Sequence, residues 1–244
     1  MEDLWKAPDK QLFHMSRYDS QFYDRSIYNT GLYARYGVPT SLSDYLLKAQ
    51  ISDYEGTRSE YEAFSIRKNA ERPATGVVYW MMNNAWPSLH WNFFDYYLKG
   101  AGSYYGAKMG SRSEHVAFEY GSKNGDIWII NHTLDKQGAR SVQIDLVTID
   151  GKTIVSKTVA ATTTPNLSRH AATVPEATKL QNAAFLRLIL RDDHNSVLSR
   201  NVYWLTPTLD QLDWDNRYFL SCFTVSWNLP RVPCSLKQST VSSY

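Results

Sequence analysis

The sequence predicts two regions of different fold class, an α/β region over residues 1–110 and an all-β region over residues 111–209. In the first region, a charged stretch with apolar residues at helical spacing precedes a continuous apolar run. In the second, short runs rich in Val, Ile, Thr and Trp recur about every ten residues. Residues 210–244 carry neither pattern and are expected to form a disordered tail.

A single long helix is predicted at about residues 41–69. Ser41 precedes Asp44 at the spacing of a capping box, with Asp where Glu is more usual. No proline interrupts the segment, and its apolar residues recur at helical spacing among charged ones. The apolar residues that define this stripe are Leu47, Ile51, Tyr54, Tyr61 and Phe64.

Residues 76–82 are predicted to form a strand that is buried on both faces. The run Gly-Val-Val-Tyr-Trp-Met-Met has no polar alternation, as is typical of strands in parallel α/β sheets. A parallel strand needs neighbours, and no other such run precedes this one. The α/β region is therefore expected to be incomplete.

The second region reads as an immunoglobulin-like β-sandwich. Its apolar residues mostly alternate with polar ones, which is typical of half-buried antiparallel strands. Asp150-Gly151 lies between two such runs and predicts a tight hairpin. The predicted strands cover residues 114–120, 126–131, 141–149, 153–160, 184–191 and 196–205.

Composition excludes several classes of function. The chain has 244 residues and a formal net charge of +2, with no segment basic enough for a nucleic-acid partner. No apolar run is long enough to span a membrane, and the charged N-terminus has no signal-peptide core. Two cysteines and no paired His or Cys spacing indicate neither a disulfide framework nor a metal site. No cofactor is expected.

Asn83, Asn84 and Trp86 are the candidate binding residues because they directly follow the predicted buried strand. In parallel α/β folds, active sites lie at the C-terminal ends of strands. Amides can donate to and accept from sugar hydroxyls, and an indole face can stack on a pyranose ring. The alternative is that Trp86-Pro87 forms a packed turn without a binding role.

No pair of catalytic carboxylates is apparent. Retaining glycosidases need two of them, about 5–5.5 Å apart. Asp95 is the only acid near the candidate site, and it is expected to be a structural hydrogen-bonding residue. The other acidic residues are assigned to a solvated helix face (Glu55, Glu60 and Glu62) or to the sandwich (Glu114 and Glu119).

Three further stretches are assigned no chemistry. Residues 100–106 are rich in glycine but lack the dinucleotide-binding spacing, so they are expected to form a turn. Arg140 is also placed on a turn. His90 lies near the candidate site, but no Ser or Cys is placed for it to activate.

Two triplets match the acceptor sequence for N-glycosylation. They are Asn131-His132-Thr133 and Asn166-Leu167-Ser168. Such triplets often arise by chance, and these have meaning only if the protein is secreted.

Residues 74–91, which include Trp86-Pro87-Ser88-Leu89-His90-Trp91, resemble the exo-β-D-glucosaminidases of glycoside hydrolase family 2. Asp95-Tyr96-Tyr97-Leu98 and residues 200–205 are also similar to that family. The similarity extends over residues 1 to about 215. Family 2 β-mannosidases and plant endo-β-mannosidases look similar in the same region, but less closely.

The resemblance implies a fold and a site. Members combine a (β/α)8 barrel with β-sandwich domains, so residues 1–110 would be the last βα segment of the barrel and residues 111–209 the sandwich that follows. Trp86 would match the aromatic residue lining the terminal sugar subsite, with Asn83 and Asn84 beside it. Both catalytic glutamates are expected upstream of Met1, so no catalytic residue is assigned in this chain.

The resemblance implies that this chain is a fragment of a larger enzyme. The parent would be an extracellular, retaining enzyme that removes terminal glucosamine from chitosan oligosaccharides, and the chain alone would be inactive. Its partner would be carbohydrate. One alternative is a non-catalytic carbohydrate-binding or interaction module, and another is a fragment of a β-mannosidase-type glycosidase.

Overall fold

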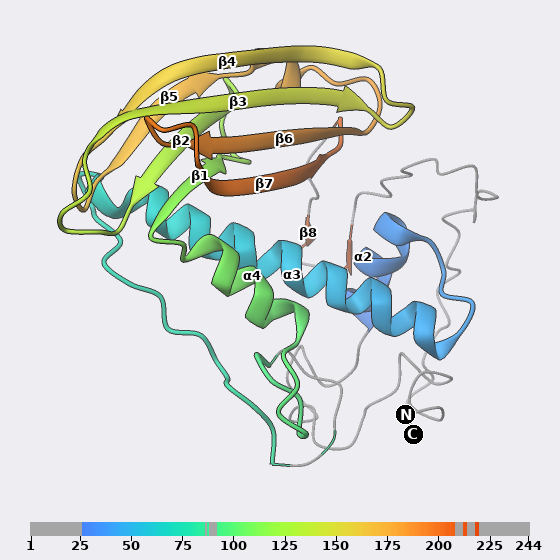
Figure 1. The fold of residues 1–244 in the computed structure, drawn as a ribbon. Helices are drawn as coiled ribbons and strands as arrows, with labels where there is room; N and C mark the ends of the chain where they lie inside the picture. The colour runs from blue at the N-terminus through green and yellow to red at the C-terminus, as the bar shows by residue number, and fades with distance from the viewer. Residues whose placement is uncertain (1–25, 86, 88–91, 208–211, 214–217, 220–244) are drawn as a thin grey trace, which may run out of the picture.

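A β-sandwich lies along one side of a long helix in the computed structural model (Figure 1). Residues 26–85, 87, 92–207, 212–213 and 218–219 are described. The helices are α2 (Ser26–Tyr36), α3 (Leu42–Ile66) and α4 (Gly102–Gly110). The strands are β1 (Glu114–Phe118), β2 (Asp126–Asn131), β3 (Gly138–Thr148), β4 (Thr153–Thr163), β5 (Ser168–Thr173), β6 (Ala184–Arg191), β7 (Val197–Leu205), β8 (Leu212–Asp213) and β9 (Tyr218–Phe219).

Helix α3 confirms the long helix predicted from sequence. Ser41 is its N-cap, and the Ser41 hydroxyl accepts a hydrogen bond from the Asp44 amide at 3.1 Å. The Asp44 carboxylate accepts from the Thr40 amide at 2.9 Å, one residue before the cap. The first bond satisfies an amide that the first turn of a helix leaves unpaired, and the second fixes the residue before the cap.

Helix α4 replaces the turn expected over residues 100–106. Its three glycines recur every four residues and face α3, against which it packs. A Cβ atom at Gly106 would lie 2.5 Å from the Tyr54 carbonyl oxygen, and one at Gly110 would lie 2.8 Å from the Tyr61 Cβ. Glycine spacing therefore serves close helix packing here, and the helix forms despite the low helix propensity of glycine.

The sandwich consists of two antiparallel sheets, with strand orders β1-β2-β5 and β4-β3-β6-β7. The hairpin predicted at Asp150-Gly151 joins β3 to β4, and Gly151 has a φ of +86°, which glycine adopts without strain. Strand β5 was missed because Ser-Arg-His-Ala-Ala-Thr has no apolar alternation. The predicted antiparallel sandwich is confirmed, and the described part of the region before it, for which an α/β segment was predicted, is helical.

The core lies between the two sheets, where inward-facing residues of β3 and β6 alternate with outward-facing ones as predicted. Complete burial of one such aliphatic side chain contributes about 1.5–3 kcal/mol. The core residues that are 0% exposed are Val116, Ile127, Val142, Ile144, Leu146, Val174, Leu186, Leu188, Leu190 and Tyr203.

Residues 76–82 do not form the predicted strand in this structure. The run is instead half covered, because Val78, Trp80 and Met82 are 96%, 74% and 66% exposed while the residues between them are partly buried. Within the described ranges, no strand lies beside this run to pair with it. Without a partner strand, the side-chain row of Val78, Trp80 and Met82 faces solvent.

The region after residue 209 holds one short strand pair. β8 pairs with β9 through Leu212 and Phe219, and Asp213 and Tyr218. The rest of the predicted tail lies outside the described residues. Among the described helices, none has the length and apolar character needed to cross a membrane.

Candidate functional site

The candidate sugar-binding residues follow the half-covered run. Asn83 is exposed, and its amide nitrogen donates to the Asn84 carbonyl at 3.5 Å. Asn84 is 9% exposed. Trp86 and His90 lie outside the described residues. Asn83 is thus open to solvent while Asn84 is covered, and a subsite that they form with Trp86 stays a prediction.

The segment that carries Asn83 and Asn84 is fixed by aromatic stacking and backbone hydrogen bonds. The rings of Tyr79 and Phe93 stack with centroids 4.1 Å apart and an interplanar angle of 11°. The Phe94 amide donates to the Met82 carbonyl at 2.9 Å, so the chain before the two amides lies against the chain after them. The connection between these two segments is thus held at both ends.

Asp95 has the structural role expected of it. Its carboxylate accepts from the Lys99 amide at 2.9 Å, and its own amide donates to the Lys99 carbonyl at 3.0 Å. Leu98 closes this turn with a φ of +61°. The carboxylate is therefore already used in fixing a turn.

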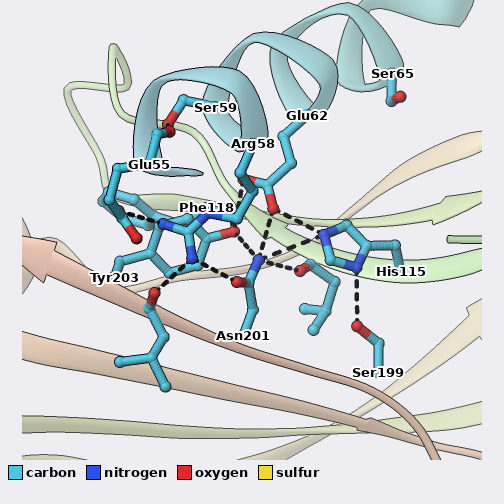
Figure 2. Close-up of polar contacts among 12 residues, drawn as sticks. Glu55, Arg58, Ser59, Glu62, Ser65, His115, Phe118, Ser199, Asn201 and Tyr203 are labelled. Carbon is cyan, nitrogen blue, oxygen red and sulfur yellow. Dashed lines mark hydrogen bonds and ion pairs between the residues drawn. The ribbon is translucent and has the colours of Figure 1, made fainter. Parts of the chain in front are cut away.

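A buried polar cluster joins α3 to the sandwich (Figure 2). At its centre is Glu62, whose side chain is only 2% exposed. The Glu62 carboxylate lies 2.8 Å from His115 Nε2 and accepts from the Asn201 amide at 2.6 Å and the Tyr203 hydroxyl at 2.9 Å. The expectation that Glu62 lies on a solvated face was wrong. A charged residue is rarely fully buried unless it is paired, and here it is.

Arg58 lies one helical turn before Glu62 and is 1% exposed. Its guanidinium donates to the Asn201 side-chain oxygen at 2.8 Å and to the Val202 carbonyl at 2.6 Å. The other terminal nitrogen donates to Glu55 at 2.6 Å, so Glu55 also belongs to the cluster and not to a solvated face. Arg58 therefore connects its own helix to β7.

Burial and charge act in opposite directions on these groups. Burial lowers the pKa of Arg58, but the negative charges of its neighbours, Glu55 foremost, reverse that effect and raise it above its ordinary value. Burial raises the pKa of Glu55, and the Arg58 charge offsets this only in part. Burial also raises the pKa of Tyr203 well above its ordinary value, which keeps its hydroxyl protonated as a donor to Glu62.

Ser199, His115 and Glu62 have the connectivity of a catalytic triad. The Ser199 hydroxyl lies 2.8 Å from His115 Nδ1, while Nε2 of the same ring faces Glu62. Ser199 and His115 are both 0% exposed, so no substrate reaches the hydroxyl. We conclude that these groups lock α3 onto the sandwich. In the part of the chain that is described, no three His, Cys, Asp or Glu side chains are grouped to hold a metal ion.

Arg140 and Glu114 form a second buried pair. Arg140 lies on β3 and not on a turn, and its guanidinium contacts the Glu114 carboxylate at 2.8–2.9 Å. Glu114 belongs to the sandwich, as predicted, and Glu119 accepts from the Trp128 indole at 2.8 Å. Glu114 and Glu119 are thus both bonded to neighbouring side chains.

Sequence reasoning missed the polar cluster, although part of its signal was present. Arg58 and Glu62 stand four residues apart on one helix face, and Ser199, Asn201 and Tyr203 alternate along one strand. Neither pattern predicts that the helix face contacts the strand face. Glu62 is separated from Asn201 and Tyr203 by 139 residues or more.

The comparisons with known proteins agree with this architecture. Residues 123–210 match the family model of the mannosidase Ig/CBM-like domain. The exo-β-D-glucosaminidase of Hypocrea jecorina is 57% identical over 216 residues, which are 88% of this chain and 24% of that enzyme. The chain is a homologue of one part of the exo-β-D-glucosaminidases. It spans about a quarter of the length of these relatives.

Solved exo-β-D-glucosaminidase structures also match most of this chain over about a quarter of their own length. The exo-chitosanase CsxA of Amycolatopsis orientalis superposes with a TM-score of 0.79 at 32% sequence identity, covering 89% of this chain and 26% of that one. That enzyme has also been solved in complex with PNP-β-D-glucosamine. The β-D-mannosidase of Dictyoglomus thermophilum, at 22% identity and a TM-score of 0.61, shares the fold.

Proposed function

We propose that this chain is part of a secreted, retaining exo-β-D-glucosaminidase that removes terminal glucosamine from chitosan oligosaccharides. The observation that carries the proposal is the 57% identity to the Hypocrea jecorina enzyme over 88% of this chain. The exo-β-D-glucosaminidases of Hypocrea virens and Arthroderma benhamiae are 56% and 54% identical over the same share. The proposal includes an extracellular parent with carbohydrate as its partner.

In this proposal residues 1–110 complete a (β/α)8 barrel, residues 111–209 form the sandwich behind it, and residues 210–244 are a separate tail. The half-covered run 76–82 would be the last barrel strand. Its exposed row, Val78, Trp80 and Met82, is apolar and supports this, because such a row is unfavourable unless other strands or helices cover it.

The catalytic carboxylates are proposed to come from the part of the enzyme that this chain does not cover. Glu55, Glu62, Glu114 and Asp95 are each bonded to neighbouring groups in the described structure. Trp86, with Asn83 and Asn84, would contribute to the wall of the terminal sugar subsite. The chain alone is then expected to be inactive, because both carboxylates are needed for retaining hydrolysis.

A second candidate function is a carbohydrate-binding module that performs no chemistry. The description of the matching family model, an Ig/CBM-like domain over residues 123–210, favours it. In that case glycan would bind the sandwich independently of the segment around Asn83.

A chimera separates these functions. The corresponding quarter of the Hypocrea jecorina enzyme is replaced by this chain and assayed on an aryl β-glucosaminide, with the chain alone as a second sample. We expect an active chimera, strongly reduced activity on Trp86→Ala, and little change on Tyr97→Ala, a ring that is 68% exposed. Turnover by the chain alone would contradict the proposal. Binding of chitosan oligomers to the chain that survives Trp86→Ala would favour the module.

A further inference from the structure

The two N-glycosylation acceptor sequences lie side by side in the fold, although they are distant in sequence. One stands at the end of β2 and the other immediately before and at the start of β5, and these strands pair. The Asn131 amide donates to the Leu167 carbonyl at 3.0 Å, and the Asn166 amide donates to the Thr133 carbonyl at 2.8 Å. The two acceptor asparagines therefore lie in the same region of the sandwich, and their surroundings can be compared directly.

Asn131 has no room for a glycan in the folded chain, so a chain that is modified there while extended cannot reach this fold. Asn131 is 0% exposed. Its side-chain nitrogen donates to the carbonyls of Lys136 at 2.8 Å and Thr164 at 3.0 Å, and its side-chain oxygen accepts from Thr133. A glycan on that nitrogen would need space that the sandwich does not have, and would break at least one of these bonds.

Asn166 has the opposite surroundings. It is exposed, and it occupies a positive φ of 50° in the connection between β4 and β5, a conformation that asparagine tolerates. Its side-chain oxygen accepts from the Lys68 ammonium at 2.7 Å. None of the described residues bonds its side-chain nitrogen. Asn166 is fixed by its side-chain oxygen and its backbone amide, so its side-chain nitrogen can carry a substituent without losing either contact.

We propose that Asn166, and not Asn131, carries an N-linked oligosaccharide when the chain is made in a eukaryotic secretory pathway. The inference rests on the extracellular parent proposed above. In the transfer step, the Asn166 amide nitrogen bonds to the anomeric carbon of a lipid-pyrophosphate-linked oligosaccharide. The bond from that carbon to the pyrophosphate oxygen breaks, the lipid pyrophosphate leaves with the bonding electrons, and the nitrogen loses one proton.

The fold accommodates the product at Asn166. The oxygen that Lys68 contacts is unchanged by glycosylation, because the sugar is attached to nitrogen. The Ser168 hydroxyl, which completes the acceptor sequence, donates to the Ser65 carbonyl at 2.7 Å in the folded chain. Ser65 precedes it by 103 residues, so in an extended chain the hydroxyl is free for the transferase.

The test is to express the full chain in yeast behind a foreign signal peptide. Material from medium and cells is digested with a peptide N-glycosidase in heavy-oxygen water, which marks each formerly glycosylated asparagine. In folded, soluble chain we expect the mark at Asn166 and none at Asn131. Asn166→Gln and Asn166→Asp should abolish the mass shift, while Ser168→Thr should keep it.

The Asn166→Asp variant retains an oxygen for Lys68, so it removes the acceptor nitrogen while keeping that contact. A mark at Asn131 in soluble chain, or an unmarked Asn166 in chain that entered the pathway, would overturn the proposal. Because the signal peptide is foreign and no hydrolysis is measured, the outcome is independent of whether the glucosaminidase assignment holds.

Discussion

The Glu62 carboxylate and the His115 imidazole lie 2.8 Å apart, although 53 residues separate them in the chain. One residue belongs to α3 and the other to β1, so their contact fixes the helix against the sandwich (Figure 2). The free energy of unfolding of this chain is therefore expected to depend on the contacts between α3 and the sandwich.

Removing Glu62 should cost more stability than removing any exposed acid of the same helix. Glu62→Ala leaves three buried donors without their acceptor, and breaking such a buried pair costs about 3–5 kcal/mol. Urea unfolding followed by circular dichroism measures the change. Glu60→Ala, an exposed position two residues earlier, should stay within about 0.5 kcal/mol. Equal effects of the two substitutions would show that the cluster does not stabilise the junction.

Two glycine-to-alanine substitutions should have opposite signs. Gly106→Ala places a Cβ 2.5 Å from the Tyr54 carbonyl oxygen and should destabilise the α3–α4 contact by about 1–3 kcal/mol. Gly56→Ala, inside α3, meets nothing within 4 Å and should stabilise by about 0.5–1 kcal/mol. Thermal unfolding of both variants measures the two changes in stability. A stabilising Gly106→Ala would contradict the close packing of α4 on α3.

Asp145 should contribute to the loss of stability in acid. Burial alone would raise its pKa, but hydrogen bonds from Ser156 and Arg187 lower it below the ordinary 3.8. An acid with a lowered folded-state pKa stabilises the fold above its unfolded-state pKa, and that contribution is lost as pH falls through the folded-state value. Asp145→Asn should therefore flatten the pH dependence of the unfolding free energy below about pH 4.

The control for this pH series is Asp135→Asn, since Asp135 is exposed. Its curve should follow that of the unmodified chain from pH 7 to pH 2. An Asp145→Asn curve that also follows it would mean that the Ser156 and Arg187 bonds do not favour the ionised form.

The exposed apolar row should bind hydrophobic dye without contributing to stability. Replacing Val78, Trp80 and Met82 by Thr, Gln and Gln should lower ANS fluorescence and change the free energy of unfolding by little, because all three are mainly in solvent. Tyr79→Ala removes the ring that stacks on Phe93 and should lower the melting temperature. A large loss of stability in the triple variant would mean that the row is covered in solution.

The sequence predicted those elements that are determined by residues close together in the chain. The Ser41–Asp44 cap, the alternation at Val142 and Ile144, and the glycine at position 151 each determine their own turn or face. Strand β5 could not be predicted in this way, because its polar sequence becomes a strand only by pairing with β2.

The errors concern residues whose state depends on distant partners. Glu62 looks like a surface acid until Tyr203 and Asn201 are placed beside it, and Gly106 looks like a turn residue until the α3 backbone is there to touch. The run at 76–82 was expected to be buried on both faces, which requires strands that the described chain does not have. The subsite formed by Asn83, Asn84 and Trp86 stays a prediction.

The contact between Glu62 and Tyr203 spans 141 residues and so sets an order of events during synthesis. A ribosome has made the whole of α3 long before it makes β7, so the charged face of the helix has no acceptor or donor from that strand until translation has passed residue 203. Docking of α3 through this contact is therefore a late event in the life of the nascent chain, and until then Arg58 and Glu62 keep the undocked helix face charged and hydrated.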